Sequence, residues 1–150
     1  MPHRDSLSAA LPAHVMTLAR SWRQLADRVL ASLEISNSTG YALLHLERRG
    51  GGMRQSDLAR EIGITEASLV RTLQHLERAG LVSREGDPED GRAKILDLTG
   101  EGAGLARKID ARLIELRAEL LDGISEEDLA TTVEVLDLIA ARINERRART

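Results

Sequence analysis

The sequence contains no cysteine and no phenylalanine, and Trp22 and Tyr41 are its two aromatic residues. The absence of cysteine excludes disulfides, thiolate nucleophiles, thiol-based oxidant sensing and zinc sites with cysteine ligands. The scarcity of aromatic rings argues against a protein that stacks single-stranded bases on several side chains. Any small-molecule sensing by this chain is therefore expected to be non-covalent.

Long apolar runs are also missing. None approaches the roughly 20 residues that a membrane-spanning helix needs, and the N-terminus lacks the basic and apolar segments of a signal peptide. We therefore expect a cytoplasmic protein. The four histidines show no metal-ligand spacing, and no glycine-rich phosphate loop follows a predicted strand. We expect no metal, no cofactor and no enzymatic activity.

What the sequence does contain is a chain of 150 residues with 42% hydrophobic and 30% charged residues, enough apolar material to form a core. Between residues 7 and 33, apolar residues recur at intervals of three and four, which predicts a long amphipathic helix. Because Pro12 disfavours a helix interior, we expect the regular part to begin near it. The preceding residues would form a first turn or a separate arm.

Caps and glycines divide the middle of the chain into short elements. Ser36 and Thr65 are predicted N-caps, and Gly50, Gly63 and Gly80 are predicted helix ends. Turn-forming residues between 85 and 92 separate two runs with strand character. The predicted elements are helices at 36–49, 55–62 and 66–79, followed by strands at 81–84 and 93–98.

Two more helices are predicted near the C-terminus. Thr99 caps the first, and Ser125 with Asp128 forms a capping box at the start of the second. The expected fold is mainly α with a small β-hairpin wing: a winged helix-turn-helix at 36–99, flanked by helical dimerisation segments at 1–35 and 100–150. Packing of the flanking helices within one chain is the alternative, but their apolar stripes exceed what so small a module could cover.

Several motifs resemble the MarR family of bacterial transcriptional regulators. They include Ser-Leu-Val-Arg-Thr-Leu from residue 68, Asp-Gly-Arg-Ala-Lys from residue 90 and Leu-Thr-Gly-Glu-Gly from residue 98. The most specific part is the Asp-x-Arg of the wing followed at the right distance by Leu-Thr-x-x-Gly. With Ser-Trp-Arg-Gln-Leu from residue 21, the pattern is most similar to the SlyA branch of that family.

The resemblance implies a homodimer that binds inverted repeats in double-stranded DNA and acts as a repressor or activator, with repression favoured. On the fourth predicted helix, Ser68, Arg71 and Thr72 supply the short and long donors that major-groove reading needs. We place them on the outward face, with His75 one turn further along. A merely solvated helix face is the competing interpretation.

The wing and the preceding helix complete the predicted DNA contacts. The resemblance implies that Arg92 enters the minor groove, with Asp90 holding its guanidinium group or bracing the loop. Lys94 is a candidate for phosphate contact. Gln55 and Ser56 begin the third helix, where amides and a hydroxyl meet phosphate in such modules, although they could equally be plain first-turn residues.

The family resemblance also implies a small phenolic or carboxylate effector bound between the dimer helices and the winged region. The corresponding residues here are Trp22, Arg23, Ser38 and Tyr41, with Arg71 at the lower edge. A cation beside aromatic surface suits an aromatic carboxylate. Core packing explains Trp22 and Tyr41 equally well. Gly40 stands where that branch often carries a bulky aromatic residue, so the pocket would differ in shape.

Charge is the feature that departs from the expected pattern. The net charge is −3, and residues 53–98 hold seven Lys or Arg against nine Asp or Glu, whereas DNA-binding regions are usually basic. We therefore expect the position of a few arginines to matter more than the total charge. An acidic balance would also suit a winged-helix module that binds another protein and no DNA, which is the alternative function.

Overall fold

The computed structural model describes residues 2–149. The chain divides into two compact units, the first ending at Leu116 and the second beginning at Arg117, so that the division falls inside one helix. Its elements are α1 (Pro2–Ser32), α2 (Asn37–Arg49), β1 (Met53–Arg54), α3 (Gln55–Ile62), α4 (Glu66–Arg78), β2 (Val82–Gly86), β3 (Lys94–Leu98), α5 (Gly100–Leu120) and α6 (Glu126–Ala148).

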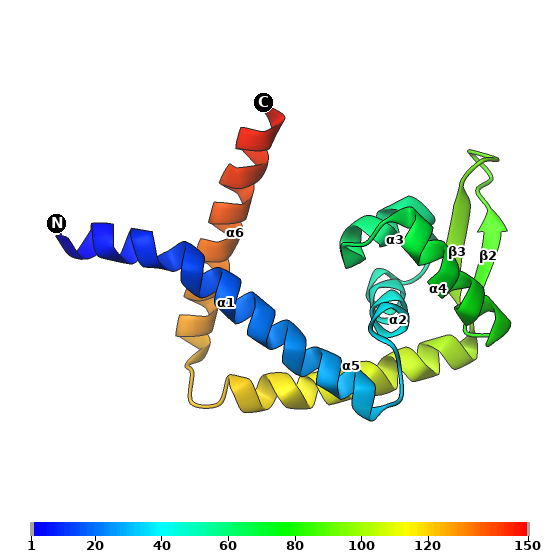
Figure 1. Ribbon diagram of the computed structural model, residues 1–150, viewed down its shortest axis with the longest axis horizontal. Coiled ribbons are helices and arrows are strands. Elements are labelled where there is room, and N and C mark those ends of the chain that lie inside the picture. Colours follow the sequence, from blue (N-terminus) through cyan, green and yellow to red (C-terminus); the bar gives the residue numbers. More distant parts are fainter. Residues whose placement is uncertain (1, 150) are drawn as a thin grey trace. The chain divides into compact units, whose positions relative to one another are not determined.

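The helices α2, α3 and α4 gather against the hairpin of β2 and β3 in the first unit (Figure 1). A short third strand, β1, pairs antiparallel with β3, which gives the sheet order β1-β3-β2. This is the predicted winged helix-turn-helix, and we call residues 36–99 the winged module. The predicted mainly α fold with a small wing is confirmed.

The structure differs from the sequence predictions at the start of the first helix and in a short strand that was not predicted. The first helix was expected to begin near Pro12, but α1 is helical from Pro2 and contains Pro12 in its interior. Because this stretch of α1 is exposed, the Ser8 carbonyl that loses its amide partner can bond to water instead. The strand β1 was missed, since two residues between a glycine run and a helix show no alternation pattern.

Predicted caps define most helix starts. Ser36, Thr65 and Ser125 each accept a hydrogen bond from the backbone amide three residues later. At the ends of α2 and α3, Gly50 and Gly63 adopt left-handed conformations. Local capping chemistry therefore explains why the sequence predicted α2, α3 and α4 to within about one residue.

The core is built almost entirely from aliphatic side chains. Its fully buried large residues come from α1, α2, α3, α4, β3 and α5, and they are Leu30, Leu43, Leu44, Leu46, Leu58, Leu69, Leu73, Leu76, Leu96 and Ile109. Leucine and isoleucine fill this space without aromatic rings because several helices contribute one stripe each. This core packs α4 against the wing.

The start of α5 is fixed to the end of α4. Thr99 donates from its hydroxyl to the Gly80 carbonyl at 2.6 Å, and its amide donates to the Leu81 carbonyl at 3.1 Å. Gly102 packs so closely here that an added Cβ would lie 1.9 Å from the Leu81 oxygen. Only glycine allows this approach, which joins the winged module to α5.

Two ion pairs also join α2 to α5. In one the cation belongs to α2, and in the other it belongs to α5. Arg48 pairs with Asp110, and Arg107 pairs with Glu47, each at 3.4 Å. Because neighbouring residues of α2 carry opposite charges, a slide along α5 would bring like charges together. These pairs therefore help to set the register of α2 on α5.

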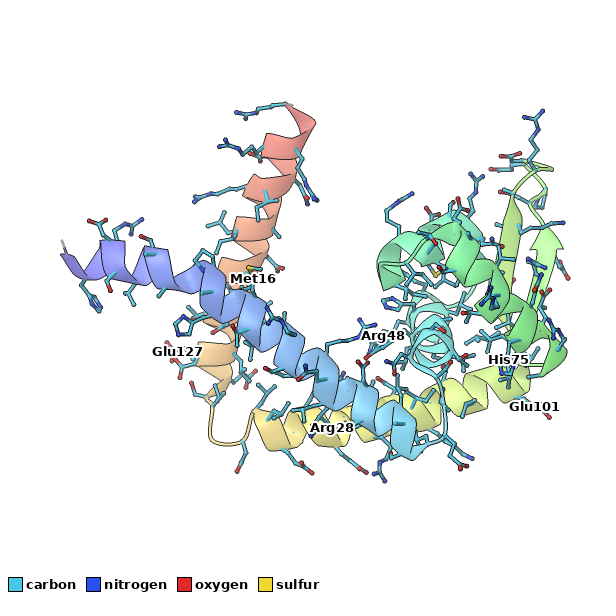
Figure 2. The ribbon with its side chains drawn as sticks, in the orientation of Figure 1. Met16, Arg28, Arg48, His75, Glu101 and Glu127 are labelled. Atoms are coloured by element: carbon cyan, nitrogen blue, oxygen red, sulfur yellow. The ribbon has the colours of Figure 1, made fainter. Side chains whose placement is uncertain are left out.

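Among residues 2–149, α1 and α6 expose large apolar side chains. The first half of α1 is exposed, including Leu7, Leu11 and Leu18, and Met16 stands free of the winged module in Figure 2. The helix α6 buries no residue at all. Within residues 2–149, none of the helices has the length and hydropathy needed to cross a membrane.

Candidate nucleic-acid interface

The helix α4 presents one apolar face and one polar face. Leu69, Leu73 and Leu76 are fully buried, and their spacing of four and three fixes the rotation of the helix. The opposite side is exposed, and we call it the reading face. It consists of Ser68, Arg71, Gln74, His75 and Arg78.

One predicted member of that face lies elsewhere. Thr72 was expected to point outward, but its side chain is 9% exposed and its hydroxyl donates to Ser38 Oγ of α2 at 3.1 Å. Position 72 lies between the buried Leu69 and Leu76, so the rotation of α4 turns it toward α2. Gln74 and Arg78, which share the reading face, were not singled out from the sequence.

A buried carboxylate organises the wing. Asp87 is 8% exposed, accepts a hydrogen bond from the Glu89 amide at 2.9 Å and pairs with Arg54 at 2.7 Å. The Glu89 amide first, and then Arg54, lower the pKa of Asp87. Sequence analysis counted Asp87 among the turn-forming residues and missed its pairing with Arg54. Asp87 thus ties the wing to β1.

Of the two roles predicted for Asp90, holding the Arg92 guanidinium or bracing the loop, its contacts match the second. Asp90 accepts a hydrogen bond from the Arg92 amide at 3.1 Å, so its carboxylate braces the loop. The side chains of Arg92 and Lys94 are exposed, and neither forms an ion pair within the described chain. Their positive charges remain available to a partner.

The two predicted contacts in the first turn of α3, Gln55 and Ser56, have different surroundings. Gln55 accepts a hydrogen bond from Arg84 at 3.4 Å, and Arg84 also pairs with Glu77 of α4 at 3.0 Å. Ser56 is exposed. Gln55 therefore helps to attach α3 to the strand β2, whereas the Ser56 hydroxyl faces solvent.

Ion pairs absorb much of the acidic charge of the winged module. Its carboxylates and cations combine as Asp57 with Arg60, Glu61 with Arg49, Glu77 with Arg84 and Asp87 with Arg54. Arg49, followed by His45, lowers the pKa of Glu61. Among the described residues, the cations of α4 and the wing that form no such pair are Arg71, Arg78, Arg92 and Lys94. The reading face therefore holds two unpaired arginines and no carboxylate, although α4 and the wing taken together are not basic.

A groove of about 440 Å³ lies beside the reading face. It is lined by Ser38 of α2, by Ile64 of the turn before α4, and by Ala67, Ser68, Arg71 and Thr72 of α4. We call it the α2–α4 groove. Its lining includes the first turns of two helices and contains no carboxylate. The structure therefore brings Ser38, predicted as an effector contact, together with residues predicted to contact DNA.

The other predicted effector contacts form a separate cluster. The Arg23 guanidinium lies 3.6 Å from the centre of the Tyr41 ring, and the Tyr41 hydroxyl donates to Asp27 at 2.9 Å. Arg23 also pairs with Asp27 at 3.4 Å. Burial, and then the Asp27 hydrogen bond, raise the pKa of Tyr41 to about 12. These three side chains join α1 to α2.

The neighbours of this cluster clarify two further positions. Trp22 is half-buried on α1. Gly40 is buried, and a Cβ added there would meet the fully buried Leu30 side chain at 2.5 Å. Leu30 thus occupies the space that a larger residue at position 40 would require. No three His, Asp or Glu side chains converge as metal ligands in residues 2–149.

Comparisons with known proteins agree with this architecture. The MarR family profile matches residues 33–93. The transcriptional regulator PA3341 is 34% identical, with a TM-score of 0.82 over 90% of this chain and 98% of that one. S. aureus MepR in its DNA-binding conformation is 25% identical, with a TM-score of 0.75 over 89% and 98%. S. aureus MepR in complex with DNA is 26% identical, with a TM-score of 0.71 over 87% and 96%.

Proposed function

The chain belongs to the MarR family and is a DNA-binding transcriptional regulator, not an enzyme; from this premise we propose that it is a homodimeric repressor of inverted-repeat operators. The observation that carries the proposal is the set of exposed cations on the reading face and the wing that form no ion pair within residues 2–149. Arg71 and Arg78 lie on α4, and Arg92 and Lys94 lie on the wing. A recognition helix and a wing are the parts of such a module that enter the grooves of DNA.

The predicted contacts divide by chemistry. Arg71 reads bases, because its planar donor fork matches the acceptor edge of guanine. Arg92 enters the minor groove, and Lys94, Ser56 and His75 contact the backbone. Asp90 and Gln55 act indirectly, since their hydrogen bonds hold the wing loop and α3. The complex of MepR with DNA supports a shared binding mode.

Dimerisation is supported by the exposed apolar stripes of α1 and α6. In this proposal, residues 1–35 and 100–150 form the dimer interface, and residues 36–99 remain free to bind DNA. A two-fold dimer presents two α4 helices to half-sites about one helical turn apart. The basic residues after Ile139 would then pair with the acidic stretch before it in the partner chain.

For the effector, we propose a small aromatic carboxylate or phenol that releases the operator. The Arg23 and Tyr41 pair offers a cation beside an aromatic face, and Trp22 lies one residue from Arg23. Such a ligand would compete with Asp27 for Arg23. Release is measured as the loss of operator binding when benzoate or 4-hydroxybenzoate is added.

The deciding experiment selects duplexes from a random pool and titrates them by fluorescence anisotropy over a series of salt concentrations. We expect selective, salt-dependent binding to an inverted repeat, with about two protomers per duplex. Capture of a protein partner without selective duplex binding at low salt would instead favour the interaction module. A reporter assay then distinguishes repression from activation.

A further inference from the structure

We propose that the α2–α4 groove holds one backbone phosphate of the operator, with Ser38 and Ser68 as paired hydroxyl donors. This inference rests on the proposed DNA-binding function and adds α2 to its contact surface. It also moves Ser38 from the predicted effector pocket to the DNA interface.

Each of the two serines is hydrogen-bonded to a threonine. Thr72 Oγ1 donates to Ser38 Oγ at 3.1 Å, and Thr65 Oγ1 donates to Ser68 Oγ at 2.9 Å. A serine hydroxyl has one hydrogen to donate and two lone pairs to accept with. Since each serine accepts from its threonine, its own hydrogen remains free. The donated bond also polarises that hydrogen and strengthens it as a donor.

The two serines face the same groove. Ser38, Ser68 and Thr72 all line it, and Thr72 is the most buried of the three, at 9% exposed. Thr65 is occupied as the N-cap of α4, where it also accepts the Ser68 amide at 3.1 Å. The threonines therefore act as positioning residues, and the serines contact the ligand.

Charge makes the ligand an oxyanion. Arg71 lines the same groove, and no acidic side chain does. By contrast, a second surface hollow beside α3 is lined by four carboxylates and three arginines, and each of these arginines pairs with one of the carboxylates. Two hydroxyl donors match the acceptor-only chemistry of a phosphate oxygen, and the positive charge of Arg71 nearby favours an anion in the groove.

The adjacent reading face favours DNA as the source of the oxyanion. Ser68 and Arg71 belong both to the groove and to the reading face of α4. When α4 lies in the major groove, the sugar-phosphate backbones run along both of its sides. A phosphate on the α2 side then meets Ser38, whose contact fixes the depth and rotation of α4.

The test is a double-mutant cycle that combines serine variants of the full chain with chemically modified copies of its selected operator and compares their affinities. Single methylphosphonates, which are uncharged, replace backbone phosphates one at a time. We expect Ser38→Ala to lower affinity about tenfold on unmodified operator, as one hydrogen bond to a charged group is lost. At one backbone position, the methylphosphonate should abolish this difference. Ser68→Ala should identify the same phosphate.

Matched variants separate positioning from folding. Thr72→Val removes the donated hydrogen bond and should lower affinity, whereas Thr72→Ser should restore it. Ser32→Ala is the control, because Ser32 lies at the end of α1 and donates to Val29. All variants should retain the thermal unfolding midpoint of the parent protein to within a few degrees.

Three results would overturn the inference. If the parent protein binds its operator selectively but Ser38→Ala binds equally well, the groove holds no phosphate while the proposed function stands. If Ser38→Ala loses affinity for benzoate and keeps its affinity for DNA, the oxyanion is a free carboxylate. If the parent protein shows no duplex selectivity, the proposed function and the inference both fail.

Discussion

The winged module and the terminal helices differ in which side chains they leave exposed to solvent. In the winged module, aliphatic side chains are buried and half of the carboxylates are paired, and the reading face presents unpaired arginines without a carboxylate among them. In α6 and the first half of α1, apolar side chains remain exposed. The first region thus lacks a polyanionic partner, and the second lacks an apolar one. One chain therefore carries two separable binding tasks.

Substitution of the α6 stripe should give the largest effect. In the variant Leu136→Glu with Ile143→Glu, two exposed apolar residues become charged, which should separate the dimer. Operator affinity should fall by about 100-fold or more, because the two half-sites are no longer bound by linked modules. Light scattering and anisotropy measure both effects.

The control for this change lies on the same helix. Thr131→Glu with Ala141→Glu adds the same charge about half a turn from the stripe, and should leave mass and affinity unaltered. Equal behaviour of the two double variants would remove the contrast between α6 and the winged module. It would also contradict the proposed dimer interface.

The link between the winged module and α5 should be the next most sensitive point. Gly102→Ala would force its Cβ against the Leu81 carbonyl oxygen, so we expect a loss of about 1–3 kcal/mol in the free energy of unfolding by urea. Gly104→Ala has open space around it and should stabilise α5 by about 0.5–1 kcal/mol. Similar values for both variants would show that α5 is not locked to α4.

Substitutions of Arg71 and Arg92 should separate base contacts from backbone contacts. Arg71→Ala should cost about 1–3 kcal/mol of discrimination at one base pair. Arg92→Ala should weaken all duplexes alike and lower the salt slope by about one. Binding titrations on operator and unrelated DNA measure both, with Arg20→Ala on α1 as control. If both variants bind like the parent protein, the groove assignments are wrong.

A smaller loss of stability than in the preceding variants is expected at high pH, when Tyr41 in the contact between α1 and α2 ionises. Tyr41 is the single tyrosine, so the absorbance of tyrosinate reports it directly, and its midpoint should lie near 12 instead of 10.0. Because its pKa is raised in the folded state, its contribution to stability is present below pH 10 and is lost between pH 10 and about 12.

Asp27→Ala tests the cause of that shift. Removing the acceptor of the Tyr41 hydrogen bond should lower the pKa toward its ordinary value, with part of the rise retained because Tyr41 remains buried. Asp5→Ala, near the start of α1, is the control. A Tyr41 midpoint at its ordinary value in the parent protein would show that the α1–α2 cluster is open in solution.

Local signals explain the successes of sequence analysis. Ser36, Thr65 and Ser125 bond to amides three residues away, so their chemistry is visible in a short stretch of sequence. Long-range contacts explain the failures. Arg54 pairs with Asp87, and Thr72 reaches Ser38 across 34 positions, so neither could be read from neighbouring residues.

The sequence by itself determined the order of helices, the wing and the family, because periodicity, caps and motifs act over a few residues. It also excluded thiol chemistry and aromatic stacking through the residues it lacks. Only the tertiary structure decided which charges are neutralised, that Thr72 faces α2, and that Ser38 lies beside the reading face. These properties depend on which distant side chains meet, and that is fixed when the leucine core packs the helices together.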